Sequence, residues 1–201
     1  MASKQRAIYW DTSVFLCFLR KHESERRAIC EDILRHAHDG KVSLYTSSFT
    51  VTEVIKPLRM ETTGPRPLSS DEVEDLQGMF HWPWLKKIAL DHRVAQDAVN
   101  LGLNFALTAA EAIHAASAIV AKVDVLQQWE RSAALERVNR LVAVEAPRML
   151  TYGVSHRPPS KGNFFEIFTA PEPPALDNAT QHRRLHHPPR VPTVLSVLTV
   201  L

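Results

Sequence analysis

The sequence predicts an α/β fold in which a central parallel sheet carries helices on both faces. Two observations support this class. Short apolar runs rich in β-branched and aromatic residues alternate with amphipathic segments of about ten to fifteen residues, which is typical of βαβ units. Acidic or hydroxyl-bearing residues that can cap a helix follow the first two of these runs. The length of 201 residues suits one domain, or one domain with a tail.

The first strand-to-helix unit lies at the N-terminal end. Residues 7–10 (Ala-Ile-Tyr-Trp) predict a strand, and residues 11–13 (Asp-Thr-Ser) can cap the helix that follows. That helix, through Leu19, is apolar almost all round, as expected for a helix packed against a sheet. A second helix over residues 23–38 ends at an Asp-Gly pair, and residues 42–45 predict the second strand.

The same alternation continues along the rest of the body. The later elements follow from the period of the apolar residues and from the positions of Gly, Pro and capping residues. We expect a helix over 49–58, a loop over 60–68, a helix over 69–79 begun by a Ser69–Glu72 capping box, a strand over 88–90, helices over 91–103 and 108–121, a strand over 123–127, a short helix over 132–138 and a strand over 141–144.

The C-terminal part of the chain has a different composition. Eight of the 13 prolines lie after residue 147, His residues increase there, and the helical period disappears. Such a segment buries too little apolar surface to offset the entropy lost on ordering. We therefore expect an α/β domain over residues 1–147 and a mostly disordered, Pro- and His-rich tail over residues 148–201.

Charge and cysteine content limit the classes of protein. The net charge of +2 is too small to indicate nucleic-acid binding by bulk electrostatics. The two cysteines, Cys17 and Cys30, are too few for a disulfide scaffold and predict buried free thiols in a reducing compartment. Neither a signal peptide nor a membrane-spanning run is recognisable, so we expect a cytoplasmic protein with no membrane partner.

Acidic residues fall at one edge of the predicted sheet. Functional groups of parallel sheets gather outside the carboxyl ends of the strands. Asp11 ends the first strand, Glu53 lies in the helix after the second, and Glu111 begins a later helix. Glu130 follows the fourth strand. Taken singly, each has a structural alternative: an N-cap for Asp11, capping boxes with Thr50 and Thr108 for the two helical glutamates, and solvation for Glu130.

Together these carboxylates predict a cation site. Acids gathered at one edge repel each other unless cations or protons compensate. Mg²⁺ and Mn²⁺ prefer oxygen ligands, with one or two direct carboxylates plus water and phosphate oxygens. Such a site favours hydrolysis of phosphodiesters, because the cation stabilises charge on the leaving oxygen.

Three runs of the sequence resemble successive motifs of the PIN-domain family, and most closely those of VapC-type toxin ribonucleases. They are residues 8–16 (IYWDTSVFL), 45–54 (YTSSFTVTEV) and 107–118 (LTAAEAIHAASA). The resemblance covers about residues 6–146 and implies a PIN-like three-layer fold. It also implies a divalent-metal-dependent endoribonuclease, using Mg²⁺ or Mn²⁺, that acts as the toxin of a type II toxin–antitoxin pair.

The resemblance assigns roles to residues and partners. It implies that the four acids, Asp11, Glu53, Glu111 and Glu130, are the catalytic and metal-binding residues. Thr12 and Ser13 are candidates for contacts with phosphate or with water around the metal. An RNA substrate, a cognate antitoxin protein and a homodimer are the implied partners.

Two features leave an alternative function open. The family usually has Asp at its third and fourth acidic positions, where this chain has Glu111 and Glu130. A degenerate PIN-like module that binds RNA or a partner protein without cutting is therefore the alternative to a ribonuclease. His114, three residues after Glu111, is expected to be packed in the core and is left out of the catalytic set.

Overall fold

The computed structural model confirms the predicted α/β class with its central parallel sheet. It describes residues 5–19, 24–55, 60–61, 64–130 and 132–150. Five parallel strands form the central sheet in the order β5-β2-β1-β6-β7. Their bounds are β1 Arg6–Trp10, β2 Val42–Ser47, β5 Leu85–Ile88, β6 Val125–Gln127 and β7 Ala143–Glu145.

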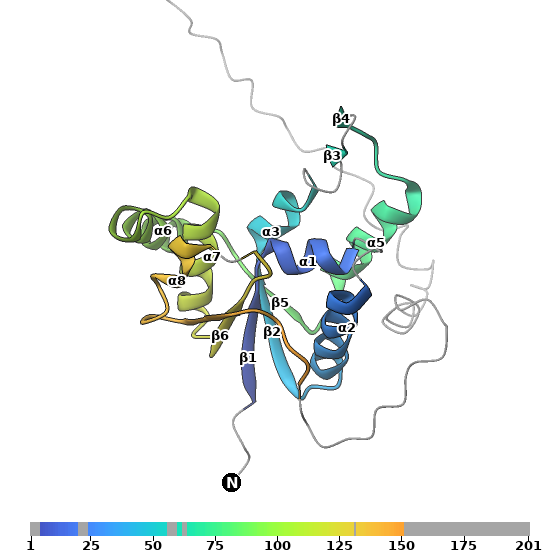
Figure 1. Cartoon of the computed structure of the whole chain (residues 1–201), viewed down its shortest axis with the longest axis horizontal. Coiled ribbons are helices and arrows are strands. Elements are labelled where there is room, and N and C mark those ends of the chain that lie inside the picture. Colours follow the sequence, from blue (N-terminus) through green and yellow to red (C-terminus); the bar gives the residue numbers. More distant parts are fainter. Residues whose placement is uncertain (1–4, 20–23, 56–59, 62–63, 131, 151–201) are drawn as a thin grey trace, which may run out of the picture. The chain divides into compact units, whose positions relative to one another are not determined.

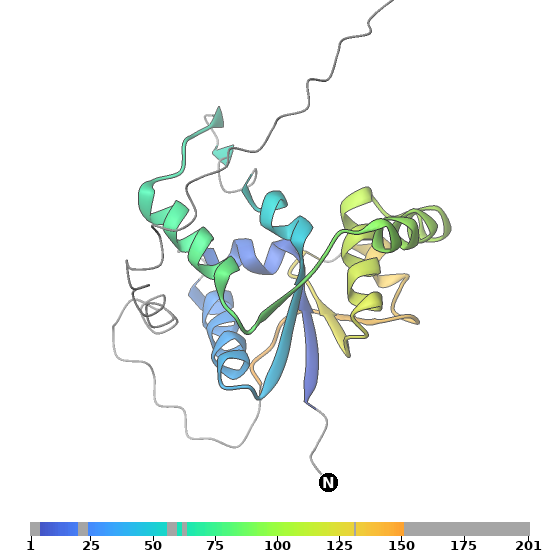
Figure 2. The ribbon, with the colours of Figure 1, turned by 180° about the vertical axis from the view of Figure 1, so that it is seen from behind.

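Helices cover both faces of this sheet. Figures 1 and 2 show α1, α2 and α5 on one side of the strands and α6, α7 and α8 on the other. The bounds are α1 Thr12–Leu19, α2 Ser24–His38, α3 Ser48–Glu53, α5 Ser70–His81, α6 His92–Phe105, α7 Ala109–Val120 and α8 Ala133–Glu136. Each described helix lies within about two residues of a predicted one at its start.

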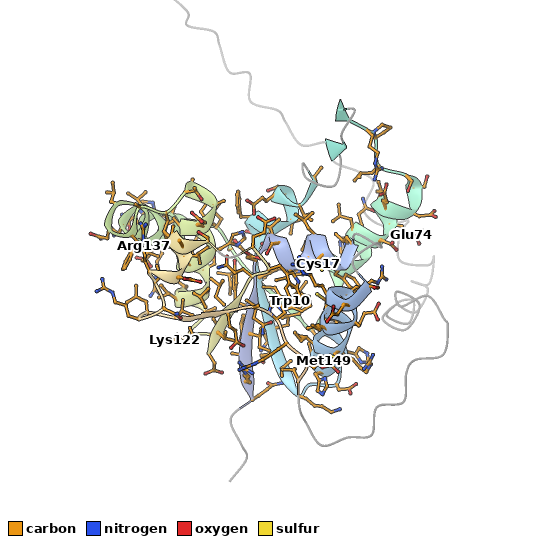
Figure 3. All side chains as sticks on the ribbon, in the orientation of Figure 1. Trp10, Cys17, Glu74, Lys122, Arg137 and Met149 are labelled. Carbon is orange, nitrogen blue, oxygen red and sulfur yellow. The ribbon has the colours of Figure 1, made fainter. Side chains whose placement is uncertain are left out.

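The alternation of side chains along β1 explains why two cores form. Successive residues of a strand point to opposite faces. Ile8 and Trp10 belong to the core shared with α1, α2 and α5, whereas Tyr9 belongs to the core shared with α6 and α7. All three side chains are fully buried, and Figure 3 shows Trp10 at the centre of the packed side chains. The continuous apolar run of β1 is thus the consequence of a sheet that is covered on both sides.

The topology changes direction at β1. The chain first adds β2 and β5 on one side of β1, then crosses to add β6 and β7 on the other side. In open α/β sheets the crevice at such a switch point is where ligands bind. Trp10 is paired with Gln127, and the backbone N–H of Asp11 donates to the carbonyl of Gln127 at 3.2 Å. The carboxyl ends of β1 and β6 therefore lie side by side.

Two local predictions were wrong. The strand expected at 88–90 begins at Leu85, and the expected loop over 60–68 contains two short antiparallel strands, β3 Met60–Glu61 and β4 Gly64–Pro65. β5 is an edge strand whose exposed Lys86 and Lys87 hide its apolar pattern, since charged side chains are common at sheet edges.

The two cysteines agree with the prediction made from composition. Cys17 and Cys30 are buried thiols that form no disulfide bond within the described residues, as predicted. Within the described ranges no single helix is long and apolar enough to cross a membrane. The pair α6 and α7 meets the length and composition test together but is bent by 119°.

The described chain continues slightly past the expected domain end. Leu150 is only 5% exposed, and its backbone N–H donates to Oδ2 of the buried Asp32 in α2 at 2.9 Å. Residues 148–150 are therefore attached to the domain. Residues 151–201 of the predicted tail, and residues 56–58 of the predicted helix over 49–58, lie outside the described residues.

Candidate functional site

A pocket of about 290 Å³ opens at the carboxyl ends of the strands near the switch point. It gathers side chains from the N-terminus of α1, the end of α3, the start of α7 and the segment after β6. All six residues predicted from the sequence line it. The full lining is Asp11, Thr12, Ser13, Leu16, Glu53, Ala110, Glu111, His114, Gln128, Glu130, Ser132 and Leu135.

Asp11 is both a helix cap and a pocket residue. Its Oδ1 accepts a hydrogen bond from the backbone N–H of Val14 at 3.3 Å, which is the N-cap arrangement for α1, and from the hydroxyl of Ser13 at 2.6 Å. The residue is 8% exposed. Burial raises the pKa of its carboxyl group above the ordinary value, and these hydrogen bonds offset only part of that effect. A buried carboxylate with this tendency binds protons or cations readily.

Glu53 does not belong to a capping box, so that alternative was wrong. α3 is capped by Ser47, whose hydroxyl accepts from the backbone N–H of Phe49 at 3.2 Å, and Thr50 lies inside the helix. One oxygen of Glu53, Oε2, instead accepts hydrogen bonds from the hydroxyl of Thr12 and from Nε2 of His114, the latter at 2.9 Å. Burial raises the pKa of Glu53, but these two donors outweigh it and leave the pKa below its ordinary value.

Glu111 forms the predicted capping box and a second contact. Its Oε2 accepts from the backbone N–H and the hydroxyl of Thr108, both at 2.8 Å, while Oε1 accepts from the hydroxyl of Ser132. Burial raises the pKa of Glu111, but the hydrogen bonds from Ser132 and Thr108 outweigh burial and leave the pKa below its ordinary value. Both oxygens of Glu111 therefore already have partners within the protein.

Glu130 lies beyond the end of β6 and is exposed, yet it lines the pocket. Its carboxylate has no hydrogen-bond partner among the described residues. Gln128, two positions earlier, is 4% exposed, and its backbone N–H donates to the carbonyl of Glu145 on β7 at 3.1 Å. The pairing of the strands thus holds the segment that carries Glu130 beside the pocket.

Two lining residues that contact the acidic side chains, His114 and Ser132, were not among the predicted site residues. His114 is 4% exposed, as predicted for a packed histidine, but its ring also borders the pocket. Ser132 caps α8, accepting from the backbone N–H of Leu135 at 3.2 Å, and contacts Glu111 as well. The spacing of Glu111 and His114, three residues apart on one helix face, was the available signal for His114. The capping role of Ser132 gave no signal for the pocket.

The donor set fits a hard divalent cation by its chemistry. The pocket is lined by carboxylate and hydroxyl oxygens, and Oε1 of Glu53 has no hydrogen-bond partner in the described part of the chain. Within that part of the chain, no group of three or more His, Cys, Asp or Glu side chains is arranged so that it could hold a metal ion without further ligands. This arrangement suits an ion that takes one or two carboxylates directly and completes its shell with water, as Mg²⁺ does.

Comparisons with known proteins support the fold. No protein-family model and no curated protein matches the chain. Among solved structures, the chain is similar to VapBC2 from Rickettsia felis, crystallised bound to a DNA fragment from their promoter. The TM-score is 0.51 with 12% identity, over 70% of this chain and 98% of that chain. A toxin–antitoxin complex from Klebsiella pneumoniae matches with a TM-score of 0.47 and 13% identity, over 71% of this chain and 99% of that chain. The likeness to VapBC2, together with the sheet order and the two helical layers, shows that this chain has a PIN-like α/β fold.

Proposed function

We propose that this protein is a divalent-metal-dependent endoribonuclease that hydrolyses phosphodiester bonds of RNA. The observation that carries the proposal is the pocket in which Asp11, Glu53, Glu111 and Glu130 come together at the switch point of the sheet. Four acidic side chains around one pocket of this size favour a cation as the normal occupant. A phosphodiester approaching such a pocket also needs a cation to neutralise its charge.

The residues have different parts in this proposal. Asp11, Glu53, Glu111 and Glu130 would hold one or two Mg²⁺ or Mn²⁺ ions, and Thr12 and Ser13 would contact phosphate or ordered water. When bound, the ion would act as a Lewis acid that stabilises negative charge on the phosphate and leaving oxygen and makes water a better nucleophile. The protein supplies the position. Asp11 at the start of α1 and Glu53 at the end of α3 line the same pocket, and the hydroxyl of Thr12 in α1 donates a hydrogen bond to Glu53.

Hydrogen bonding keeps two of these groups charged. The pKa values of Glu53 and Glu111 lie below their ordinary value, so both carboxyl groups are ionised at neutral pH. The donors responsible come from Thr12 and His114 for Glu53, and from Thr108 and Ser132 for Glu111. The described lining residues include no lysine or arginine, so a bound cation would balance the negative charge of these two groups.

A second candidate function is a module of the same fold that binds RNA or a partner protein without cutting. The observation that favours it is the position of Glu111, whose two oxygens are engaged by Thr108 and Ser132. A carboxylate that caps its own helix is less available to an ion. The two candidate functions differ in whether the protein cleaves RNA or only binds its partner.

The deciding experiment is cleavage of a mixed structured RNA pool by the purified protein with Mg²⁺, with Mn²⁺ and with EDTA, beside an Asp11→Asn variant. Asn retains an oxygen acceptor for the N-cap of α1 but removes the charge, so the fold is expected to persist. Metal-dependent cutting that disappears in Asp11→Asn supports the nuclease. RNA binding without cutting, with an intact circular dichroism spectrum, supports the second candidate.

The partners follow from the same proposal. The similar VapBC2 structure supports a cognate antitoxin as the protein partner, and we propose a cytoplasmic homodimer as the working form. Co-expression with a cognate antitoxin would then suppress RNA cleavage. Size-exclusion chromatography coupled to light scattering tests the dimer, and a monomeric mass would remove that part of the proposal.

A further inference from the structure

A chain of hydrogen bonds runs from Tyr9 through His114 to Glu53, and Thr12 contacts the same end of it. Tyr9 of β1 is fully buried, and its hydroxyl lies 2.9 Å from Nδ1 of His114 on α7. The other ring nitrogen, Nε2, lies 2.9 Å from Oε2 of Glu53 on α3. The hydroxyl of Thr12 reaches the same oxygen and lies 3.2 Å from Nε2. One oxygen of Glu53 is therefore held by two donors.

We infer that His114 is a positioning residue, which fixes one oxygen of Glu53 so that the other serves the cation. This inference rests on the proposed function, because it concerns how Glu53 is presented to the ion. It assigns His114 no contact with substrate. It also assigns Tyr9, on the opposite side of the imidazole, the role of orienting His114.

The tautomer of His114 follows from its neighbours. A neutral imidazole carries one N–H and one acceptor nitrogen. The carboxylate of Glu53 can only accept a hydrogen bond, so the ring proton lies on Nε2 and is donated to Oε2. Nδ1 is then the acceptor nitrogen, and the hydroxyl of Tyr9 donates to it. Groups that orient a ligand through its second atom in this way are a recurrent feature of metal sites.

Packing prevents the imidazole from turning away. The ring of Tyr9 meets it edge to face with centroids 5.9 Å apart, and the ring of Phe49 lies at 5.8 Å with an interplanar angle of 60°. His114 itself is 4% exposed. A ring that is enclosed by two aromatic side chains and hydrogen-bonded at both nitrogens is held in one orientation. The hydrogen bond from Nε2 then orients the carboxylate of Glu53.

The test measures Mn²⁺ binding by isothermal titration calorimetry, with no RNA present. His114→Gln keeps an N–H donor near the place of Nε2, whereas His114→Leu removes it. Loss of such an orienting partner costs roughly 10- to 100-fold in metal affinity. We expect His114→Leu to weaken Mn²⁺ binding by roughly that factor and His114→Gln to remain within about threefold of the wild type. Equal affinity of the Leu variant and the wild type would overturn the inference.

A double-mutant cycle tests whether His114 acts through Glu53. Once Glu53→Gln is present, adding His114→Leu should weaken Mn²⁺ binding no further. An equal loss in both backgrounds would show general damage and would also overturn the inference. His36→Leu is the matched control, because His36 is a buried histidine of α2 that does not line the pocket. Its Mn²⁺ affinity should be unchanged, and thermal melting of each variant reports the fold.

The outcomes separate the inference from the proposed function. A wild-type protein that binds no Mn²⁺ removes the metal-dependent function and this inference together. A wild-type protein that binds Mn²⁺, with an unaffected His114→Leu variant, removes only the role of His114.

Discussion

The hydroxyl of Ser13 donates to Oδ1 of Asp11 at 2.6 Å, two positions away at the start of α1. The same hydroxyl accepts the backbone N–H of Trp129 at 2.9 Å. Ser13 therefore joins the carboxylate at the end of β1 to the segment that follows β6, across the switch point of the sheet. The pocket is fixed at this point by side-chain chemistry as well as by strand pairing.

Replacing Ser13 with Ala is expected to destabilise the protein and the pocket together. The buried Asp11 carboxylate loses a donor and the N–H of Trp129 loses an acceptor. Unsatisfied buried groups of this kind cost about 1–3 kcal/mol in the free energy of unfolding. Urea denaturation measures the loss, and Ser13→Thr, which keeps the hydroxyl, is the matched control. A Ser13→Ala variant as stable as the wild type would show that water replaces both contacts.

Two variants of Glu111 distinguish its role in capping α7 from a role in RNA cleavage. Gln serves in a capping box as Glu does, so Glu111→Gln should keep the stability of α7. Glu111→Ala loses the box and leaves Ser132 without its acceptor, at a cost of about 1 kcal/mol. Thermal melting measures this difference. In RNA cleavage, both variants should fall well below the wild type. Full cleavage by Glu111→Gln would instead mean that Glu111 only caps its helix.

Glu72 gives a pH-dependent prediction away from the pocket. Arg66, at 2.7 Å from Nη1 to Oε2, and the backbone N–H of Ser69 hold its pKa at about 2, against an ordinary value of 4.5. Because the folded state has the lower pKa, the ionised group stabilises the fold fully above pH 4.5, and that contribution is lost as the pH falls toward about 2.

The variant Glu72→Gln should therefore melt slightly below the wild type at neutral pH. Both side chains of the ion pair are about one third exposed, which limits the difference to less than about 1 kcal/mol. The difference in melting temperature between the wild type and Glu72→Gln should become smaller as the pH falls from 4.5 toward 2, and melting curves across that range test this. Glu74→Gln, at an exposed position on the same helix, is the matched control and should stay within about 0.5 kcal/mol of the wild type at neutral pH. A gap of constant size for Glu72→Gln would contradict the assigned pKa.

Asp32 anchors the last described residues to α2. It is 2% exposed and accepts the backbone N–H of Leu150. Asp32→Ala leaves that N–H buried without an acceptor and should lower the free energy of unfolding by about 1–3 kcal/mol, whereas Asp32→Asn keeps an oxygen acceptor and should lose less. Chemical denaturation compares them with Asp39→Ala, a surface substitution expected to stay within about 0.5 kcal/mol. Equal stability of Asp32→Ala and Asp39→Ala would remove the anchoring role.

The order of the elements could be predicted because its signals are local. Apolar period, capping residues and Gly or Pro positions act over a few residues, and they located β1, α1, α5 and α7 within about two residues. The edge strand β5 was misplaced because Lys86 and Lys87 interrupt its apolar pattern, and only pairing with β2 defines it. Local patterns do not contain that pairing.

The sequence by itself determined the α/β class, the edge at which the acids gather, and the identity of six pocket residues. Only the tertiary structure decided what each carboxylate contacts. Glu53 is held by His114, 61 positions away, and Glu111 by Ser132, because the packing of α7 and α8 brings these side chains to the same pocket. Hydrogen bonds between distant residues depend on how helices pack on the two faces of the sheet, and this packing has no local period in the sequence.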